Sequence, residues 1–107
     1  MIRPLTGRGR FEAVRRDGRT VSDGEIRIRF RLDGGDQVRV AYAISSRGST
    51  AVGRNRLRRR LRAALADLDR RDAIPSGDYV VSAVRRTAEI PFPDLIGRIL
   101  KLLEKIR

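Results

Sequence analysis

Apolar and polar residues alternate with a period of two along two stretches near the middle of the chain. In the first, residues 26–32, two isoleucines, a phenylalanine and a leucine alternate with arginines. In the second, residues 38–44, two valines, a tyrosine and an isoleucine alternate with Arg39 and two alanines. This alternation predicts two strands, each with one face in the core, joined by a turn at 33–36. The outer face of the second strand is small, so a bulky ligand could approach it closely.

Helical spacing appears on both sides of these strands. A short helix is predicted at 10–17, with Gly18 able to end it. A broadly apolar final helix begins near Pro91 and Pro93, where a missing N–H costs little, and runs to about Ile106. We expect this final helix to pack on the sheet or at an interface.

The longest helical pattern runs from Ala51 to about Asp69, with leucines at helical spacing and Thr50 as a plausible N-cap. A loop at 72–78 and a mostly apolar strand at 79–84 follow it. The 107 residues suit one domain, 1–107, with one core.

Composition removes several kinds of chemistry. The chain has no cysteine and no histidine, which excludes disulfides, Cys/His zinc sites and His-based acid–base catalysis. No stretch approaches the roughly 20 apolar residues of a membrane-spanning helix, and the first residues lack the apolar run of a signal peptide. We therefore expect a cytoplasmic protein with no membrane partner.

Positive charge is concentrated in the first part of the chain. The net charge is +12, and residues 1–62 contain 17 arginines but only 6 acids. Genome composition explains some of the preference for arginine over lysine, but it would not confine the excess to these residues. A one-sided basic field predicts a polyanionic partner such as RNA, DNA or an anionic membrane surface.

The strongest concentration of charge lies at 54–62, which holds six arginines and no acid. Arg54, Arg58 and Arg62 are spaced by four and share one stripe, while Leu57 and Leu61 point to the core. The charge is expected to extend around the polar side of the helix through Arg56, Arg59 and Arg60. This segment could instead be a solvated surface face, but such a face normally mixes positive and negative charges. It could also be a helix on a membrane surface, but no aromatic residue faces outward to enter the membrane. The arginine fork suits phosphate, so this segment favours RNA binding.

Residues 39–62 read RVAYAISSRGSTAVGRNRLRRRLR, which resembles the bacterial ribonuclease P protein family. Phe11 and Val14, spaced by three and followed by Gly18, resemble the first helix of that family. The sequence GDYVV at 77–81 and the Leu-rich final helix also fit, so the resemblance covers nearly the whole chain. It implies an α/β (α+β) two-layer sandwich in the order αβββαβα, with a mixed four-stranded sheet and a left-handed βαβ crossover.

The resemblance also implies two RNA-binding surfaces. The surface for ribonuclease P RNA would comprise Arg47, Arg54, Asn55, Arg56, Arg58, Arg59 and Arg62. The cleft for the 5′ leader of precursor tRNA would comprise Phe11, Arg15, Arg27, Arg29, Arg39, Ala41 and Ala43.

The chain departs from the family at three positions. Arginines stand at 15 and 29, where the family often has aromatics, and Ser46 replaces a usual lysine. Leader binding is therefore expected to rely more on phosphate contact than on base stacking. Phe11 fits either a stacking role or a place in the core.

The family implies that catalysis resides in the RNA subunit. The acids of this chain are scattered, so we assign no catalytic residue and no metal ligand, and expect Mg²⁺ to be held mainly by the RNA subunit and substrate. The expected partners are ribonuclease P RNA, in a 1:1 complex, and precursor tRNA, with no organic cofactor and no obligate protein partner. Two alternatives remain: a ribosomal protein or general RNA chaperone, and a protein-only nuclease.

Overall fold

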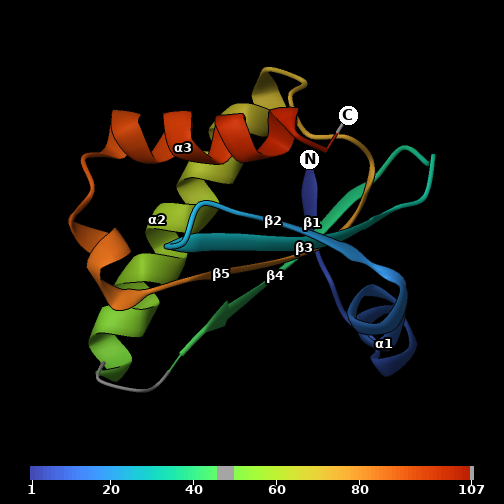
Figure 1. The fold of residues 1–107 in the computed structure, drawn as a ribbon, viewed down its shortest axis with the longest axis horizontal. Helices are drawn as coiled ribbons and strands as arrows, with labels where there is room; N and C mark the ends of the chain where they lie inside the picture. Colours follow the sequence, from blue (N-terminus) through green and yellow to red (C-terminus); the bar gives the residue numbers. More distant parts are fainter. Residues whose placement is uncertain (46–49, 107) are drawn as a thin grey trace.

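The computed structural model describes residues 1–45 and 50–106. In these residues the chain forms a five-stranded mixed sheet with three α-helices and one 3₁₀ helix (Figure 1). The elements are β1 (Ile2–Pro4), α1 (Arg8–Asp17), β2 (Arg19–Ser22), β3 (Ile26–Leu32), β4 (Val38–Ile44), α2 (Ala51–Arg70), β5 (Gly77–Ala83), η1 (Arg85–Glu89) and α3 (Phe92–Glu104).

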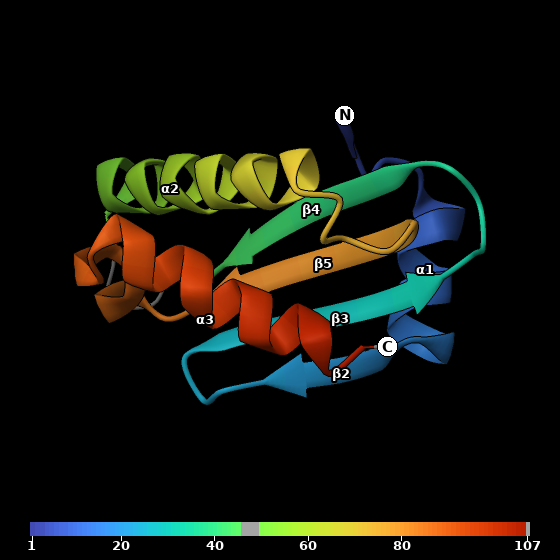
Figure 2. The ribbon, with the colours of Figure 1, turned by 90° about the horizontal axis from the view of Figure 1, so that it is seen from above.

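The strand order across the sheet is β1-β4-β5-β3-β2. β4 pairs in parallel with both β1 and β5, whereas β3 pairs antiparallel with β5 and β2. The parallel pair β4 and β5 is joined through α2. Figure 2 views the sheet from its helix side, and when β4 and β5 are turned to run upward, β5 lies to the left of β4. The crossover is therefore left-handed, against the usual rule and as the family resemblance implied.

Two layers enclose the core. α2 and α3 cover one face of the sheet, while α1 lies on the opposite side (Figure 1). The alternation in β3 is confirmed for Ile26, Ile28 and Phe30, which are buried beneath the helices while Arg27 and Arg31 are exposed. The fourth apolar residue of the pattern, at the end of the strand, is exposed and not part of the core. The sheet therefore has a helix-covered face and a second face, the open face, which α1 covers only at one end.

The helix layer is held by leucine and isoleucine packing. On α2, Leu57, Leu61 and Leu68 are almost completely buried. On α3, Leu95 and Ile99 are fully buried and belong to the same core. The spacing of these residues by four and seven explains why both helices present one apolar stripe to the sheet.

The sheet has five strands, one more than the four that were expected. β1 adds a fifth strand, pairing with β4 so that Ile2 lies opposite Val38 and Arg3 opposite Arg39. A strand of three residues is too short to produce a detectable alternation, which explains its absence from the prediction. The 3₁₀ helix η1 was also not predicted, and α1 begins at Arg8, two residues before the expected start.

An ion-pair cluster joins the β2–β3 turn to the segment after β5. Arg98 pairs with Asp23 at 2.8 Å and with Glu25 at 2.9 Å, and Arg86 also pairs with Glu25. Burial acts to raise the pKa of Asp23, but hydrogen bonds from the Ile26 and Glu25 N–H groups and from Arg98 outweigh it and hold the pKa below its usual value. Hydrogen bonds from Arg86 and Arg98 likewise lower the pKa of Glu25.

Acid should therefore weaken the fold through these carboxylates. Because their pKa values are lower in the folded state, their contribution is present above the unfolded pKa of about 4 and disappears as the pH falls through the folded values. We expect Arg98→Gln to lower Tm at pH 7 and to differ less from the wild type at pH 3. Thermal melts followed by circular dichroism measure both differences, and an equal loss at the two pH values would contradict this role.

Candidate nucleic-acid interface

The basic helix α2 carries its charge on the side away from the core. Its N-terminus is capped by Thr50, whose side-chain oxygen accepts a hydrogen bond of 3.0 Å from the Gly53 N–H, as predicted. The core-facing leucines fix the rotation of the helix about its axis, so the remaining positions are directed outward. Asn55, Arg56, Arg59 and Arg62 are exposed, and Arg54 and Arg58 are half-buried. The structure thus brings six of the seven residues predicted to contact ribonuclease P RNA onto one helix, and the seventh, Arg47, lies outside the described residues.

Two arginines of this face make contacts with neighbouring side chains. Arg58 donates a hydrogen bond of 3.0 Å to the Asn55 side-chain oxygen. The guanidinium of Arg62 lies over the Tyr42 ring, 5.5 Å from its centroid. These contacts orient the arginine heads before any ligand arrives, while each head keeps further N–H donors for phosphate.

Arg60 does not belong to this outward surface. Its guanidinium donates to the backbone oxygens of Thr87, Ala88 and Ile90, at and just after η1. Sequence reasoning placed Arg60 on the polar side with its neighbours, and that assignment is wrong. Its guanidinium instead bonds backbone carbonyls at the end of the short helix, so Arg60 joins α2 to the segment before α3.

The open face of the sheet forms a second basic surface. Cross-strand pairing sets Val80 of β5 between Arg29 and Ala41, and Ser82 of β5 between Arg27 and Ala43. Both alanines and Arg27 therefore lie on the open face, as expected. Ala43 is exposed there and Ala41 is partly exposed.

Two of the expected leader-binding arginines make several contacts within the protein. Arg29 donates to the carbonyl oxygens of Val14 and Arg15 at the C-terminus of α1, and to the Thr20 hydroxyl. A cation at this end of a helix is favourable, because the last carbonyls lack partners. Arg39 pairs with Asp78 at 3.2 Å and is only 20% exposed. Both arginines therefore help to hold the framework of the open face.

α1 supplies the remaining expected positions at the edge of this surface. Val14 is buried against the sheet, whereas Phe11 is 41% exposed. Phe11 is therefore not a fully buried core residue. Arg15 is exposed and pairs with Glu12 at 2.7 Å, and this hydrogen bond lowers the pKa of Glu12. An accessible ring and a surface cation thus flank the open face.

Asp78 joins α1 to the sheet, and sequence reasoning gave it no role. Its side chain is 4% exposed and pairs with Arg39 and, at 3.3 Å, with Arg10 of α1. An acid in a mostly apolar strand is itself a signal, since a buried carboxylate needs a partner, but the sequence does not name that partner. Arg31, exposed on the open face and paired across from Asp78, was also left out of the expected cleft although it continues the alternation of Arg27 and Arg29.

Asp78→Asn should destabilise the protein, because it leaves two arginines without their buried carboxylate. We expect a loss of about 2 kcal/mol in the free energy of unfolding, moderated because Arg10 is half exposed and can be hydrated. Urea unfolding measures this loss. The matched control is Asp33→Asn, which removes the more exposed partner of Arg39 and should cost under about 0.5 kcal/mol. Equal losses from the two variants would contradict the role of Asp78.

The carboxylates of the described residues do not fit a metal site on this chain. Across residues 1–45 and 50–106 no three metal-ligating side chains gather closely enough to hold an ion. Several acids are instead paired with arginines, including Asp23, Glu25, Asp67 and Asp78. A carboxylate neutralised by a guanidinium is a poor ligand for Mg²⁺.

None of the helices in residues 1–45 and 50–106 combines the length and the hydropathy that a membrane-spanning segment needs.

The sequence of this chain is similar to those of known proteins. A family model described as Ribonuclease P matches residues 3–107. The chain belongs to the ribonuclease P protein family. The ribonuclease P protein component of Symbiobacterium thermophilum is 33% identical over 103 residues, covering 94% of this chain and 88% of the relative. That of Brucella suis is 41% identical over 61 residues, which are 57% of this chain but only 43% of the relative, so the match spans less than half of that protein.

Solved structures of ribonuclease P proteins share the fold. The protein from Thermotoga maritima aligns with a TM-score of 0.80 and 25% identity, covering 97% of each chain. The Staphylococcus aureus protein aligns with a TM-score of 0.79 at 16% identity, covering 97% of this chain and 94% of its own. The mixed sheet with helices on both sides is thus the architecture of the ribonuclease P protein family.

Proposed function

We propose that this chain is the protein subunit of the ribonuclease P ribonucleoprotein. In this role it binds the catalytic RNA and the 5′ leader of precursor tRNA, and promotes endonucleolytic removal of the leader to give the mature 5′ end. The observation that carries the proposal is the outward face of α2, where Arg56 and Arg59 are exposed beside Asn55 in a chain of the ribonuclease P family.

The α2 face and the open face would bind different RNAs. The α2 face would neutralise phosphates of the ribonuclease P RNA, and the open face, on the other side of the sheet, would hold the single-stranded leader. Arg27, Ala41 and Ala43 offer a charged and a flat contact there, with Phe11 at the edge for one stacked base. This arrangement would bridge two RNAs that otherwise repel each other.

Catalysis belongs to the RNA subunit in this proposal. Several of the described acids are engaged by arginines, and the chain has no histidine, which supports a binding role for the protein. Mg²⁺ would be held by the RNA subunit and substrate, with no organic cofactor. The protein would act in the cytoplasm in a 1:1 complex with the RNA, without an obligate protein partner.

The proposal is tested by comparing precursor tRNA with mature tRNA. Adding the protein to a bacterial ribonuclease P RNA should increase affinity for the precursor by about tenfold or more, and leave that for mature tRNA nearly unchanged, since only the precursor has a leader. Equal effects on both RNAs would instead favour a ribosomal protein or general RNA chaperone. Mg²⁺-dependent cleavage by the purified protein alone would favour a protein-only nuclease.

A further inference from the structure

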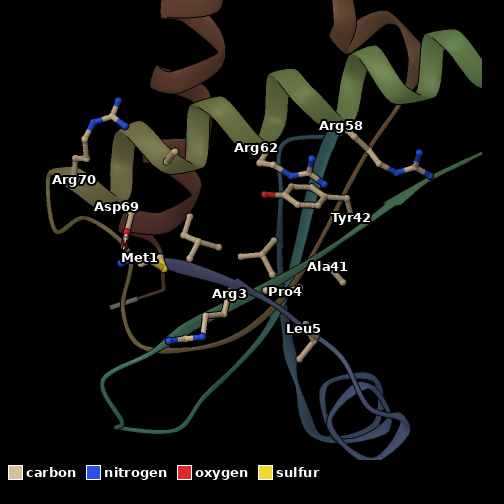
Figure 3. Close-up of a pocket in the computed structure, with 13 residues that line it drawn as sticks. Met1, Arg3, Pro4, Leu5, Ala41, Tyr42, Arg58, Arg62, Asp69 and Arg70 are labelled. Atoms are coloured by element: carbon tan, nitrogen blue, oxygen red, sulfur yellow. Dashed lines mark ion pairs between the residues drawn. The ribbon is translucent and has the colours of Figure 1, made fainter.

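A groove lies between β1, β4 and α2, on the helix side of the sheet edge. We call it the β1–α2 groove (Figure 3); its volume is about 860 Å³. Ile2, Val40 and Ala66 contribute apolar surface to its lining, and Arg58 and Arg62 line it from α2. This volume falls within the range of small-ligand sites, which are typically apolar with a few convergent polar groups.

The charge of the groove favours an anion attached to an apolar or aromatic group. Arg58 and Arg62 line it from α2, whereas the side chains of Arg3 and Arg70, which also belong to its lining, are directed away from the space between β1 and α2 (Figure 3). Its one acid, Asp69, is paired with the Met1 amino group. Arg58 and Arg62 are one helical turn apart and also belong to the basic face of α2, so the groove continues that face toward β1. A ligand bound to the α2 face can therefore extend into the groove without leaving the basic surface.

Tyr42 of β4 also lines the groove and carries a hydroxyl group. It was expected as a core residue of its strand, but it is only partly buried, and its side chain and that of Arg62 point toward each other (Figure 3). Its hydroxyl is buried and makes no hydrogen bond within the described residues, so a ligand reaches it only when the neighbouring side chains move aside. Burial raises the pKa of Tyr42 to about 12, and Arg62 lowers it only in part, so near neutral pH the hydroxyl remains a donor.

We propose that the β1–α2 groove binds one unstacked nucleotide of the ribonuclease P RNA. The base lies against the apolar lining, the Tyr42 hydroxyl bonds a base edge or ribose hydroxyl, and the phosphate is held by Arg58 and Arg62. A nucleotide matches each property of the groove: an aromatic face, hydrogen-bonding edges and an anionic link. This inference rests on the proposed function and adds a base-binding site to a surface otherwise described by phosphate contact.

The test uses paired variants on one helix. Ala66→Met fills the groove and should weaken binding of a bacterial ribonuclease P RNA by about tenfold, the scale of one lost stacked base. Ala63→Met is the matched control, because Ala63 is exposed on α2 and does not line the groove. Tyr42→Phe keeps the ring and should weaken binding severalfold through loss of the hydroxyl bond. Filter binding measures all four proteins, after thermal melts have shown that each is folded.

A second readout reports on the base itself. Ribonuclease P RNA containing 4-thiouridine should crosslink to peptides that include Tyr42 or β1, and these crosslinks should disappear with Ala66→Met. Equal binding by Ala66→Met and Ala63→Met, or crosslinks confined to other peptides, would overturn the groove site while leaving the proposed function intact. Failure of the wild-type protein to bind ribonuclease P RNA specifically would overturn both.

Discussion

Replacing Arg56 and Arg59 together by glutamine should lower affinity for ribonuclease P RNA by roughly one to two orders of magnitude. Both side chains are exposed on the outward face of α2, so their loss removes phosphate contacts without opening the core. The dependence of log K on log salt should also become shallower by about 2, since each phosphate contact contributes roughly 0.9 to the slope. Filter binding over a series of salt concentrations gives both quantities.

The control for this variant removes the same charge from another surface. Lys101→Gln with Lys105→Gln subtracts two positive charges from exposed positions at the end of α3. If the position of the charges matters, this control should change affinity only slightly. Similar losses from both double variants would mean that net charge alone drives RNA binding, and the assignment of the α2 face would then fail.

Gly18→Ala should cost about 3 kcal/mol in the free energy of unfolding. Gly18 ends α1 and lies close to β3, and a Cβ there would stand 2.3 Å from the Val14 carbonyl oxygen and 2.8 Å from that of Phe30. Both obstacles are backbone atoms, so no side-chain rotation can relieve the clash. For a domain of this size the loss corresponds to a fall of at least about 12 °C in Tm, which calorimetry would detect.

Gly9→Ala tests the same substitution on the same helix without the clash. A Cβ at Gly9 meets nothing within 4 Å, so alanine should raise stability by about 0.5–1 kcal/mol through its better helix propensity. A Gly18→Ala protein as stable as Gly9→Ala would show that α1 does not need this close approach to the sheet.

Much of the fold follows from short-range patterns in the sequence. The alternation at 26–32 and 38–44 predicted β3 and β4 because one face of each strand is buried. The leucine spacing after Thr50 predicted α2 and the direction of its basic face. These features depend on residues within a few positions of one another, which a single sequence displays.

Contacts between distant segments were not predictable in the same way. Arg60 bonds carbonyls about 27–30 residues further along the chain, and Asp78 pairs with Arg10 across 68 residues. In the sequence, Arg60 and Arg10 look like the other arginines of their helices. The packing of α2 and α1 against the rest of the chain determines which arginine of each helix turns inward. The same holds for Arg29, whose partners include carbonyl oxygens in the last turn of α1.

The candidate site also has a part that the sequence predicted and a part that only the structure shows. The residue pattern indicated the outward arginines of α2, while the family resemblance supplied the leader cleft. The β1–α2 groove needed the structure, because it is formed by the unpredicted strand β1 together with Tyr42 and α2. A site between three elements that are far apart in the sequence leaves no local pattern.

The role that we propose for this protein is to act with a catalytic RNA in maturing the 5′ end of tRNA. The most direct measurement is cleavage of 5′-labelled precursor tRNA by a bacterial ribonuclease P RNA at low Mg²⁺, with and without the protein. We predict cleavage at the mature 5′ end only when both components are present. No stimulation across several bacterial ribonuclease P RNAs, by a protein shown to be folded, would contradict the account.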